Sequence, residues 1–264
     1  MYTNESSTMQ TMNKTINQTL AWKAARMMVL TLLVGAVAYS CSDSTFEENT
    51  EGKGYEYYPL GVGHEWIYEV DSAVYINQGN DVRRSSSQVR ELIVDTTQSA
   101  NLQYIIQEST RATADDPWFV TDVYTAELSE DQAFRTESNR RFIKLVFPVR
   151  ESRRWDGNIH FDDRVSIDIA GETLRVYEDW DYAMSIEDTT VSGQTYTDAL
   201  RVSHVDRETA ISKTESYEYY AKDIGLVYKK LVALENQNIN DPAPWEEKAM
   251  GGYIIEKRLL SFSK

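Results

Sequence analysis

Residues 55–76 read YEYYPLGVGHEWIYEVDSAVYI. Pro59 and the glycines that follow it predict a turn, and after this turn Trp66, Tyr68 and Val70 recur at a spacing of two. Acidic side chains at positions 65, 69 and 71 lie on the opposite face. Strict alternation of apolar and polar residues is typical of a strand with one buried face. This stretch therefore predicts that a folded domain opens with a half-buried β-strand.

The same alternation recurs to the end of the chain, with short polar turns between the segments. The further strands that it predicts lie at residues 88–96, 102–108, 118–128, 142–149, 165–169, 173–177, 182–187, 200–204 and 253–262, with two more within 216–234. The polar segment 129–140 favours a loop or a short helix. Because no segment beyond residue 41 shows a helical period over helical length, we predict a single all-β antiparallel domain at 55–264. A sandwich, an open barrel and a strongly curved sheet all fit this pattern.

Cys41 is the only cysteine of the chain, and it directly follows the apolar run MMVLTLLVGAVAYS at residues 27–40. Lys23 and Arg26 precede that run. A positive flank, a short apolar core and small residues at the end are typical of a secretory signal peptide. The run is shorter than the roughly 20 apolar residues that span a bilayer. We therefore predict a signal peptide at 1–40.

Residues 38–41 (AYSC) resemble the lipobox of bacterial lipoproteins, in which the cysteine carries a diacylglycerol. The resemblance implies cleavage between Ser40 and Cys41, a lipid on Cys41 and a membrane anchor at the cell envelope. An uncleaved membrane anchor and a secreted protein with a stray cysteine are the alternatives. Residues 41–54 are polar and acidic, which predicts a lipidated tether ahead of the domain.

Charge and composition exclude several classes of function. The formal net charge is −15, and residues 1–41 contribute three basic side chains against one acidic one, so the remainder is more acidic still. Nucleic-acid binding needs a basic face, which this chain lacks. Residues 64–68 (HEWIY) miss the second histidine of a zinc-protease motif, and no nucleotide-binding loop or nucleophile elbow is present. We therefore expect no cofactor and no enzymatic activity.

Three segments resemble a group of uncharacterised envelope lipoproteins of Bacteroidota. They are YYPLGVGHEWIYEVDS at 57–72, YEYYAKDIGLVYKK at 217–230 and GGYIIEKRLLSF at 251–262. The match touches both ends of the predicted domain. It implies an all-β extracytoplasmic lipoprotein domain, and it implies no activity and no active residue.

Two sets of residues are candidate ligand contacts. Trp245 lies in the long, proline-containing segment 236–250, and an aromatic side chain on such a loop favours contact with a ligand or partner; the alternative is that the indole caps one end of the sheet. Asp179 and Asp181 flank Trp180 and are predicted to share a strand face. A carboxylate pair beside an indole is typical of sugar sites, although solvated acids and core packing explain the same pattern.

Acidic residues near His160 offer a weak candidate for a calcium site. Asp156, Asn158, Asp162 and Asp163 supply oxygen atoms, but they lack the ordered spacing of an EF-hand loop, so we expect no metal. His204 lies in an alternating apolar segment, which favours a buried histidine with a satisfied side chain.

The sequence as a whole favours a lipid-anchored binding or accessory module of the cell envelope, whose partner is an envelope protein or a small molecule. Two alternatives remain. One is a carrier that holds an acyl chain in a curved sheet, which requires an apolar cavity. The other is a glycan-binding protein or hydrolase built on Asp179, Trp180 and Asp181.

Overall fold

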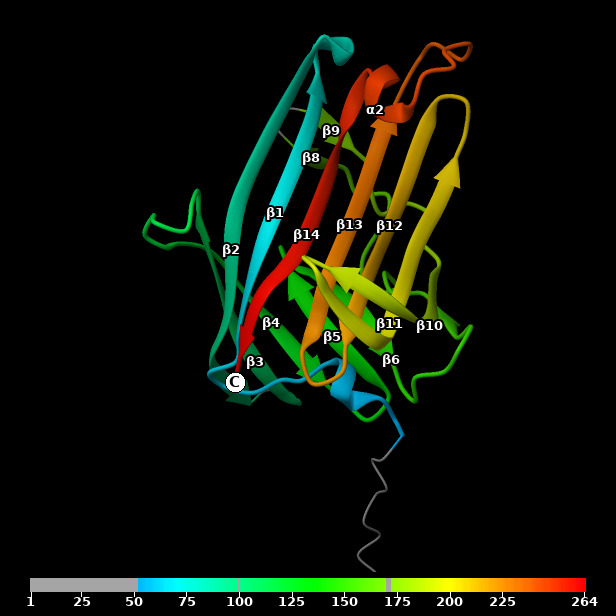
Figure 1. Ribbon diagram of the computed structural model, residues 1–264. Helices are drawn as coiled ribbons and strands as arrows, with labels where there is room; N and C mark the ends of the chain where they lie inside the picture. Colours follow the sequence, from blue (N-terminus) through cyan, green and yellow to red (C-terminus); the bar gives the residue numbers. More distant parts are fainter. Residues whose placement is uncertain (1–51, 99, 170–171) are drawn as a thin grey trace, which may run out of the picture. The chain divides into compact units, whose positions relative to one another are not determined.

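One large antiparallel sheet dominates the described part of the chain in the computed structural model (Figure 1), which describes residues 52–98, 100–169 and 172–264. The predicted signal peptide, Ser40, Cys41 and nearly all of the tether lie outside these residues. Among the described residues, none of the helices has the length and apolar character needed to cross a bilayer.

The sheet has twelve strands, in the order β6-β5-β4-β3-β2-β1-β14-β13-β12-β11-β10-β7. Their bounds are β1 Glu65–Ile76, β2 Asp81–Gln98, β3 Leu102–Arg111, β4 Phe119–Leu128, β5 Gln132–Glu137, β6 Arg140–Val146, β7 Arg154–Trp155, β10 Tyr182–Val191, β11 Gln194–Glu208, β12 Ser212–Ala221, β13 Gly225–Glu235 and β14 Gly251–Ser263. Strands that follow one another in the chain mostly pair as hairpins. The first and last strands, β1 and β14, pair antiparallel in the middle of the sheet.

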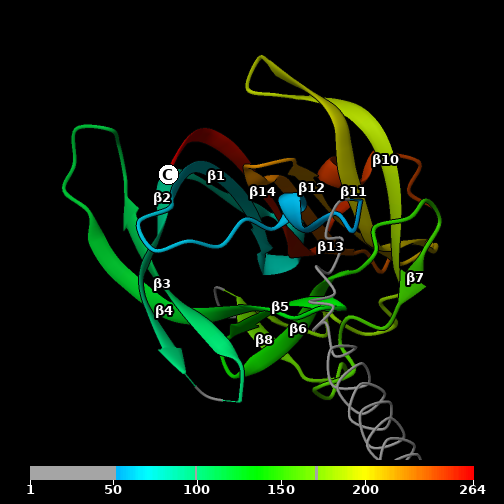
Figure 2. The same cartoon turned by 90° about the horizontal axis from the view of Figure 1, so that it is seen from below.

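The sheet curls until its two ends meet. Trp155, in the last strand β7, donates from Nε1 to the carbonyl oxygen of Ile143 in β6 at 2.9 Å. The amide nitrogen of Ile143 donates to the oxygen of Gly157, also at 2.9 Å. We call the contact between β6 and residues 155–157 the seam. Figure 2 shows the strands of the sheet curving around the interior. The predicted all-β antiparallel fold is therefore confirmed, and of the three arrangements left open the structure shows a nearly closed barrel.

The segment 129–140 is neither a loop nor a helix. It contains strand β5, and the turn into β6 is made by Ser138 and Asn139, both with positive φ. The prediction was wrong because Arg135 and Glu137 point into the barrel, where the lining is charged. A strand with polar side chains on its inner face shows no alternation of apolar and polar residues.

The inner face of the barrel changes character along β13. Lys229 lines a cavity, whereas Leu231 and Ala233, further along the same face, pack against Leu174 and Val176. These last two residues belong to the long connection between β6 and β10, which also carries the small hairpin of β8 (Ile167–Ile169) and β9 (Glu172–Leu174). The connection fills one part of the interior and leaves the other part to the cavity.

Candidate ligand cavity

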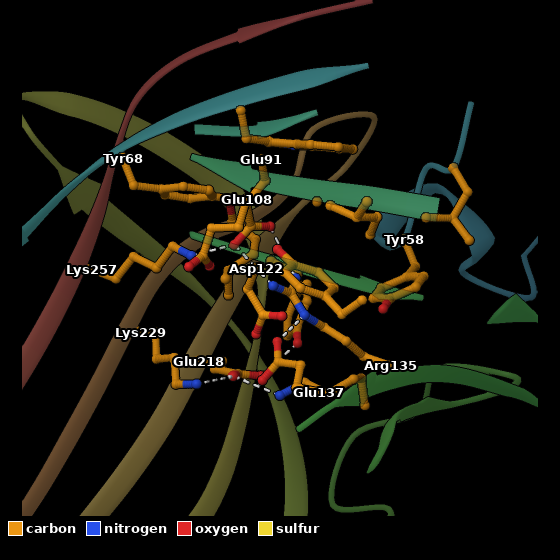
Figure 3. A pocket seen from close by; sticks show the side chains of 18 of the residues that line it. Tyr58, Tyr68, Glu91, Glu108, Asp122, Arg135, Glu137, Glu218, Lys229 and Lys257 are labelled. Atoms are coloured by element: carbon orange, nitrogen blue, oxygen red, sulfur yellow. Dashed lines mark hydrogen bonds and ion pairs between the residues drawn. The ribbon is translucent and has the colours of Figure 1, made fainter. Parts of the chain in front are cut away.

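A cavity of about 220 Å³ lies on the inner side of the sheet, between β2–β6 and β12–β14 (Figure 3). Its wall combines tyrosine rings with an unusual number of ionisable groups. Among the described residues, the charged ones are Glu91, Glu108, Asp122, Glu137 and Glu218, with Arg135, Lys144, Lys229 and Lys257. Charged side chains are expensive to bury unless they are paired, so their contacts decide what the cavity can do.

Glu91 of β2 is held by two cations. Arg135 donates to both of its carboxylate oxygens, at 3.0 and 2.9 Å, and Lys257 pairs with Oε1. Burial alone would raise the pKa of Glu91. The charges of Arg135 and Lys257 outweigh that effect and hold the pKa well below its usual range, so Glu91 is ionised throughout the physiological range.

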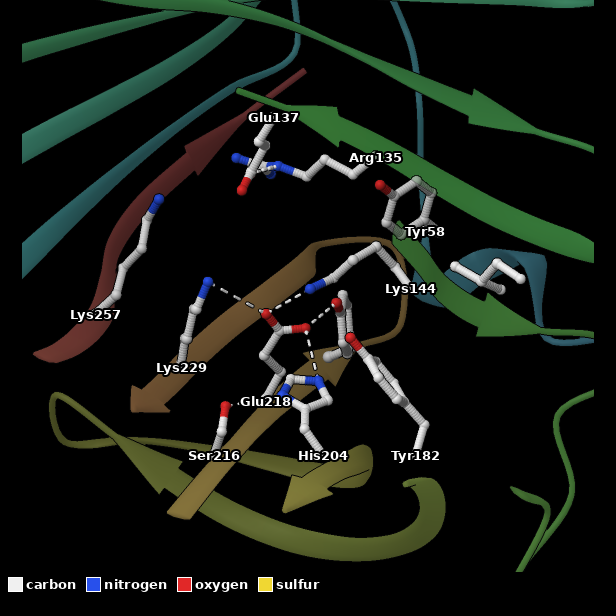
Figure 4. A network of polar contacts seen from close by, with 12 residues as sticks. Tyr58, Arg135, Glu137, Lys144, Tyr182, His204, Ser216, Glu218, Lys229 and Lys257 are labelled. Carbon is white, nitrogen blue, oxygen red and sulfur yellow. Dashed lines mark hydrogen bonds and ion pairs between the residues drawn. The ribbon is translucent and has the colours of Figure 1, made fainter. Parts of the chain in front are cut away.

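Glu218 of β12 is the centre of a second cluster (Figure 4). Lys144 approaches Oε1 at 2.7 Å and Lys229 approaches the same oxygen at 3.7 Å, while the hydroxyl of Tyr220 donates to Oε2 at 2.5 Å. Burial opposes ionisation here too, but Lys144 and the neighbouring His204 hold the pKa of Glu218 well below its usual range. Each of the two buried carboxylates therefore has two cationic partners.

His204 of β11 is buried beside Glu218. Its Nδ1 lies 2.9 Å from Oγ of Ser216, and its Nε2 lies 3.6 Å from Oε2 of Glu218. Burial is the main reason that the pKa of His204 falls to about 4, so the imidazole is neutral at pH 7. The predicted burial of this histidine is confirmed. The prediction of a satisfied side chain was wrong for one of its two nitrogens, because Nε2 has no hydrogen-bond partner among the described residues.

The grouping of Ser216, His204 and Glu218 contains the residue types of a hydrolase triad. Ser216 is 0 % exposed, however, and it does not line the cavity. A catalytic nucleophile must reach a substrate atom, and the Ser216 hydroxyl has no path to one in this structure. The cluster therefore supports the packing of β11 against β12.

Glu108 and Asp122 differ from the other lining carboxylates. Among the described residues neither forms an ion pair, and Glu108 accepts only a long hydrogen bond of 3.4 Å, from the Thr121 hydroxyl. Burial raises the pKa of Glu108. Asp122 is exposed and marks the mouth of the cavity.

Trp245 lies away from the cavity, at the start of the short helix α2 (Trp245–Lys248). It is 5 % exposed and packs against Tyr75, Val232 and Leu234, on the face of β13 opposite to Lys229. The structure thus shows the alternative arrangement, in which the indole covers the sheet and is not presented to a ligand.

The residues around Trp180 form no paired site. Asp179 and Asp181 lie in the turn before β10 and share no strand face, which corrects the prediction. Asp179 pairs with Arg207 at 2.6 Å, and Asp181 pairs with Arg154. The indole of Trp180 stacks on His204, with ring centroids 4.8 Å apart, so it is engaged in packing.

The side chains considered as weak calcium ligands mostly form hydrogen bonds with nearby residues. Asn158 is buried; its Nδ2 donates to the oxygen of Tyr177 at 3.3 Å, and its Oδ1 accepts from the Tyr182 hydroxyl at 2.9 Å. Asp156 and Asp162 each accept a backbone N–H two residues further on, while Asp163 follows in the same loop. Within the described ranges, no group of three or more His, Cys, Asp or Glu side chains is placed to share a metal ion.

The sequence did not predict the charged lining of the cavity, because the residues that form it come from strands that are distant in the chain. One local signal existed. Lys144 interrupts the apolar run FIKLVF at 142–147, in a segment predicted to be buried on both faces. A lysine at such a position requires a buried partner, which the structure shows to be Glu218.

Comparison with known proteins gives matches at the level of structure. No protein-family model and no curated sequence matches this chain. A candidate exported protein with a YmcC-like fold from Bacteroides fragilis is similar in structure, with a TM-score of 0.41 and 10% identity, over 78% of this chain and 98% of that one. A candidate lipoprotein from Parabacteroides distasonis gives a TM-score of 0.38 and 12% identity, over 78% and 98%.

Proposed function

We propose that this protein is a lipid-anchored module of the cell envelope that binds a small polar ligand in the cavity of its barrel and does not transform it. The observation that supports this proposal is the solvent-reachable space of about 220 Å³ with a charged and aromatic wall. Buried ion pairs seldom stabilise a fold more than apolar side chains of similar volume would. A lining of this kind therefore suits recognition better than it suits stability.

The volume limits the size of the ligand. An engineered protein cavity of about 150 Å³ holds benzene, and pockets for drug-sized molecules measure roughly 300–1,000 Å³. A space of about 220 Å³ therefore suits a molecule of about one ring, such as a monosaccharide or an amino acid.

The charged wall of the cavity also helps to judge the two alternative functions, the acyl-chain carrier and the glycan-binding protein or hydrolase. An acyl chain would displace water from Glu108, Glu137 and Lys229 without replacing its hydrogen bonds, which is costly. The carrier alternative therefore loses its support. A sugar-sized ligand remains compatible, but its site would be the cavity and not Asp179, Trp180 and Asp181, because both carboxylates are ion-paired and the indole ring is stacked on another side chain.

The test uses the full chain, exported with its own N-terminal segment and purified in mild detergent. Thermal shift and calorimetry with a panel of monosaccharides, amino sugars and amino acids measure binding. A ligand at one hundred times its Kd stabilises the folded state by about 2.7 kcal/mol. Binding should be lost in Lys229→Met, which removes a cation of the wall, and kept in Glu247→Gln, which changes an exposed acid on α2.

Two results would contradict the proposal. If no compound of the panel binds, or if Lys229→Met binds as tightly as the unchanged protein, the cavity is not the ligand site. If a bound compound is chemically altered, the non-enzymatic part of the proposal fails.

A further inference from the structure

Two carboxylates lie side by side on neighbouring strands in the wall of the cavity. Glu108 of β3 and Asp122 of β4 are direct partners in the antiparallel register, and both line the cavity (Figure 3). Like charges at directly opposite positions of two strands destabilise a sheet. The protein therefore keeps an unfavourable pair in the wall of the cavity, and one of its members, Asp122, is exposed to solvent.

The cations of the wall are paired with other carboxylates. Arg135 and Lys257 are bound to Glu91, and Lys144 and Lys229 lie around Glu218. Within the described part of the chain, neither Glu108 nor Asp122 is in an ion pair. The nearby charge of Lys257 lowers the pKa of Glu108, but burial raises it by more, so this carboxylate is poorly compensated.

An independent observation points to a ligand at the same place. Tyr124 is 4 % exposed and lines the cavity, and its hydroxyl has no hydrogen-bond partner among the described residues. It follows Asp122 by two positions on β4, so the two side chains share a face of the sheet. A buried hydroxyl without a partner costs about 1–3 kcal/mol, which makes it available to a bound group.

We propose that the ligand of this cavity carries a protonated primary amine, which binds between the carboxylates of Glu108 and Asp122 and donates a further hydrogen bond to the hydroxyl of Tyr124. The inference rests on the proposed binding function and specifies its ligand class. An ammonium group has three N–H donors and no acceptor, and these three side chains supply oxygen acceptors. The positive charge also removes the repulsion between the two carboxylates.

The test compares probes that differ only in the amine. Glucosamine is paired with glucose, and 1,4-diaminobutane with 1,4-butanediol; binding to the full chain in detergent is measured by calorimetry at pH 7. We expect each amine to bind at least tenfold more tightly than its neutral partner. Glu108→Gln and Asp122→Asn should each weaken amine binding about tenfold or more, Tyr124→Phe by several-fold, and Glu247→Gln not at all.

The outcomes separate this inference from the proposed function. If neutral probes bind as well as amines, and Lys229→Met abolishes binding while Glu108→Gln does not, the cavity binds ligands but the amine assignment is overturned. If amines bind equally to Glu108→Gln, Asp122→Asn and the unchanged protein, they bind elsewhere and the assignment fails. If none of the four probes binds, the assignment also fails.

Discussion

Glu108 carries a charge that the ligand-free protein compensates poorly, and this has a consequence for stability. Burial raises its pKa above the value of an unfolded chain, so ionisation at neutral pH costs the folded state more than the unfolded state. We expect Glu108→Gln to raise the free energy of unfolding at pH 7 by about 1 kcal/mol when no ligand is present. Urea denaturation measures this change.

The matched control for that substitution is Glu247→Gln, at an exposed position on α2. Substitutions at such surface positions usually change stability by less than about 0.5 kcal/mol. A loss of stability in Glu108→Gln would show that the carboxylate is well compensated, and would contradict its description as a free ligand contact.

His204 makes stability depend on pH in a defined window. Its folded-state pKa of about 4 lies below the usual value near 6.5, mainly because of burial, although Glu218 opposes the shift and Lys144 and Lys229 add to it. Between about pH 6.5 and 4 the unfolded chain binds a proton that the folded chain does not. The free energy of unfolding therefore falls as the pH falls, by roughly 2 kcal/mol from pH 7 to 5 through this residue alone.

Substitution separates this contribution from those of the many carboxylates. Denaturation at pH 7 and pH 5 should show that His204→Gln loses most of the pH-dependent fall. His160→Gln, at an exposed position, should keep it. An equal fall in His204→Gln and the unchanged protein would mean that the imidazole is not the group that titrates.

At the scale of the elements, the turn after β7 depends on a close approach of backbone to a ring. A Cβ atom on Gly157 would lie only 2.5 Å from Cε1 of Tyr182. Tyr182 is fully buried, and its hydroxyl is fixed by Asn158, so the ring has no free space into which to move. We expect Gly157→Ala to lower the free energy of unfolding by about 1–3 kcal/mol.

The control is Gly251→Ala at the start of β14, where an added Cβ meets no atom within 4 Å. It should leave the denaturation midpoint nearly unchanged. Similar losses in the two variants would point to a general cost of replacing glycine, and not to the contact with Tyr182.

Alternation was a reliable guide wherever one face of a strand is apolar. Trp66 and Tyr68 of β1 are buried, as the spacing of two predicts. The same rule failed for β5, because Arg135 and Glu137 face a charged interior and therefore look like residues of a polar loop. The rule requires an apolar inner face and a polar outer face, and in part of this barrel both faces are polar.

The cavity itself lay beyond sequence reasoning for a geometric reason. Glu91 meets Arg135 across 44 positions of the chain and Lys257 across 166. Such pairs follow from the strand order, in which β14 lies beside β1, and no local pattern encodes that order. Apart from Lys144, each charge, taken alone, is typical of a solvated strand edge.

At the scale of the whole molecule, ion pairs connect strands that are not neighbours in the sheet. Lys144 of β6 reaches Glu218 of β12, and Arg135 of β5 reaches Glu91 of β2. The first of these pairs crosses the interior from one end of the sheet toward the other. Side chains that line the cavity therefore link distant parts of the sheet across the interior, and the seam joins its two ends.

The seam provides the test of closure. Trp155→Phe keeps an aromatic ring against Tyr182 but removes the hydrogen bond to the oxygen of Ile143. We expect a loss of about 1–2 kcal/mol in the free energy of unfolding, because a buried carbonyl is left without its donor. Native-state hydrogen exchange should be faster at the amide of Ile143, which bonds to Gly157 across the seam, and unchanged at Val202 in the middle of β11.

The control has to remove a comparable bond elsewhere. Trp66 donates from Nε1 to the oxygen of Ile224 at 2.6 Å, away from the seam, so Trp66→Phe should destabilise the protein without speeding exchange at Ile143. If the two variants speed exchange at Ile143 equally, the barrel opens only by unfolding as a whole. If Trp155→Phe alone does so, β6 opens locally, and because Lys144 of β6 lines the cavity, such an opening would also loosen the wall of the cavity.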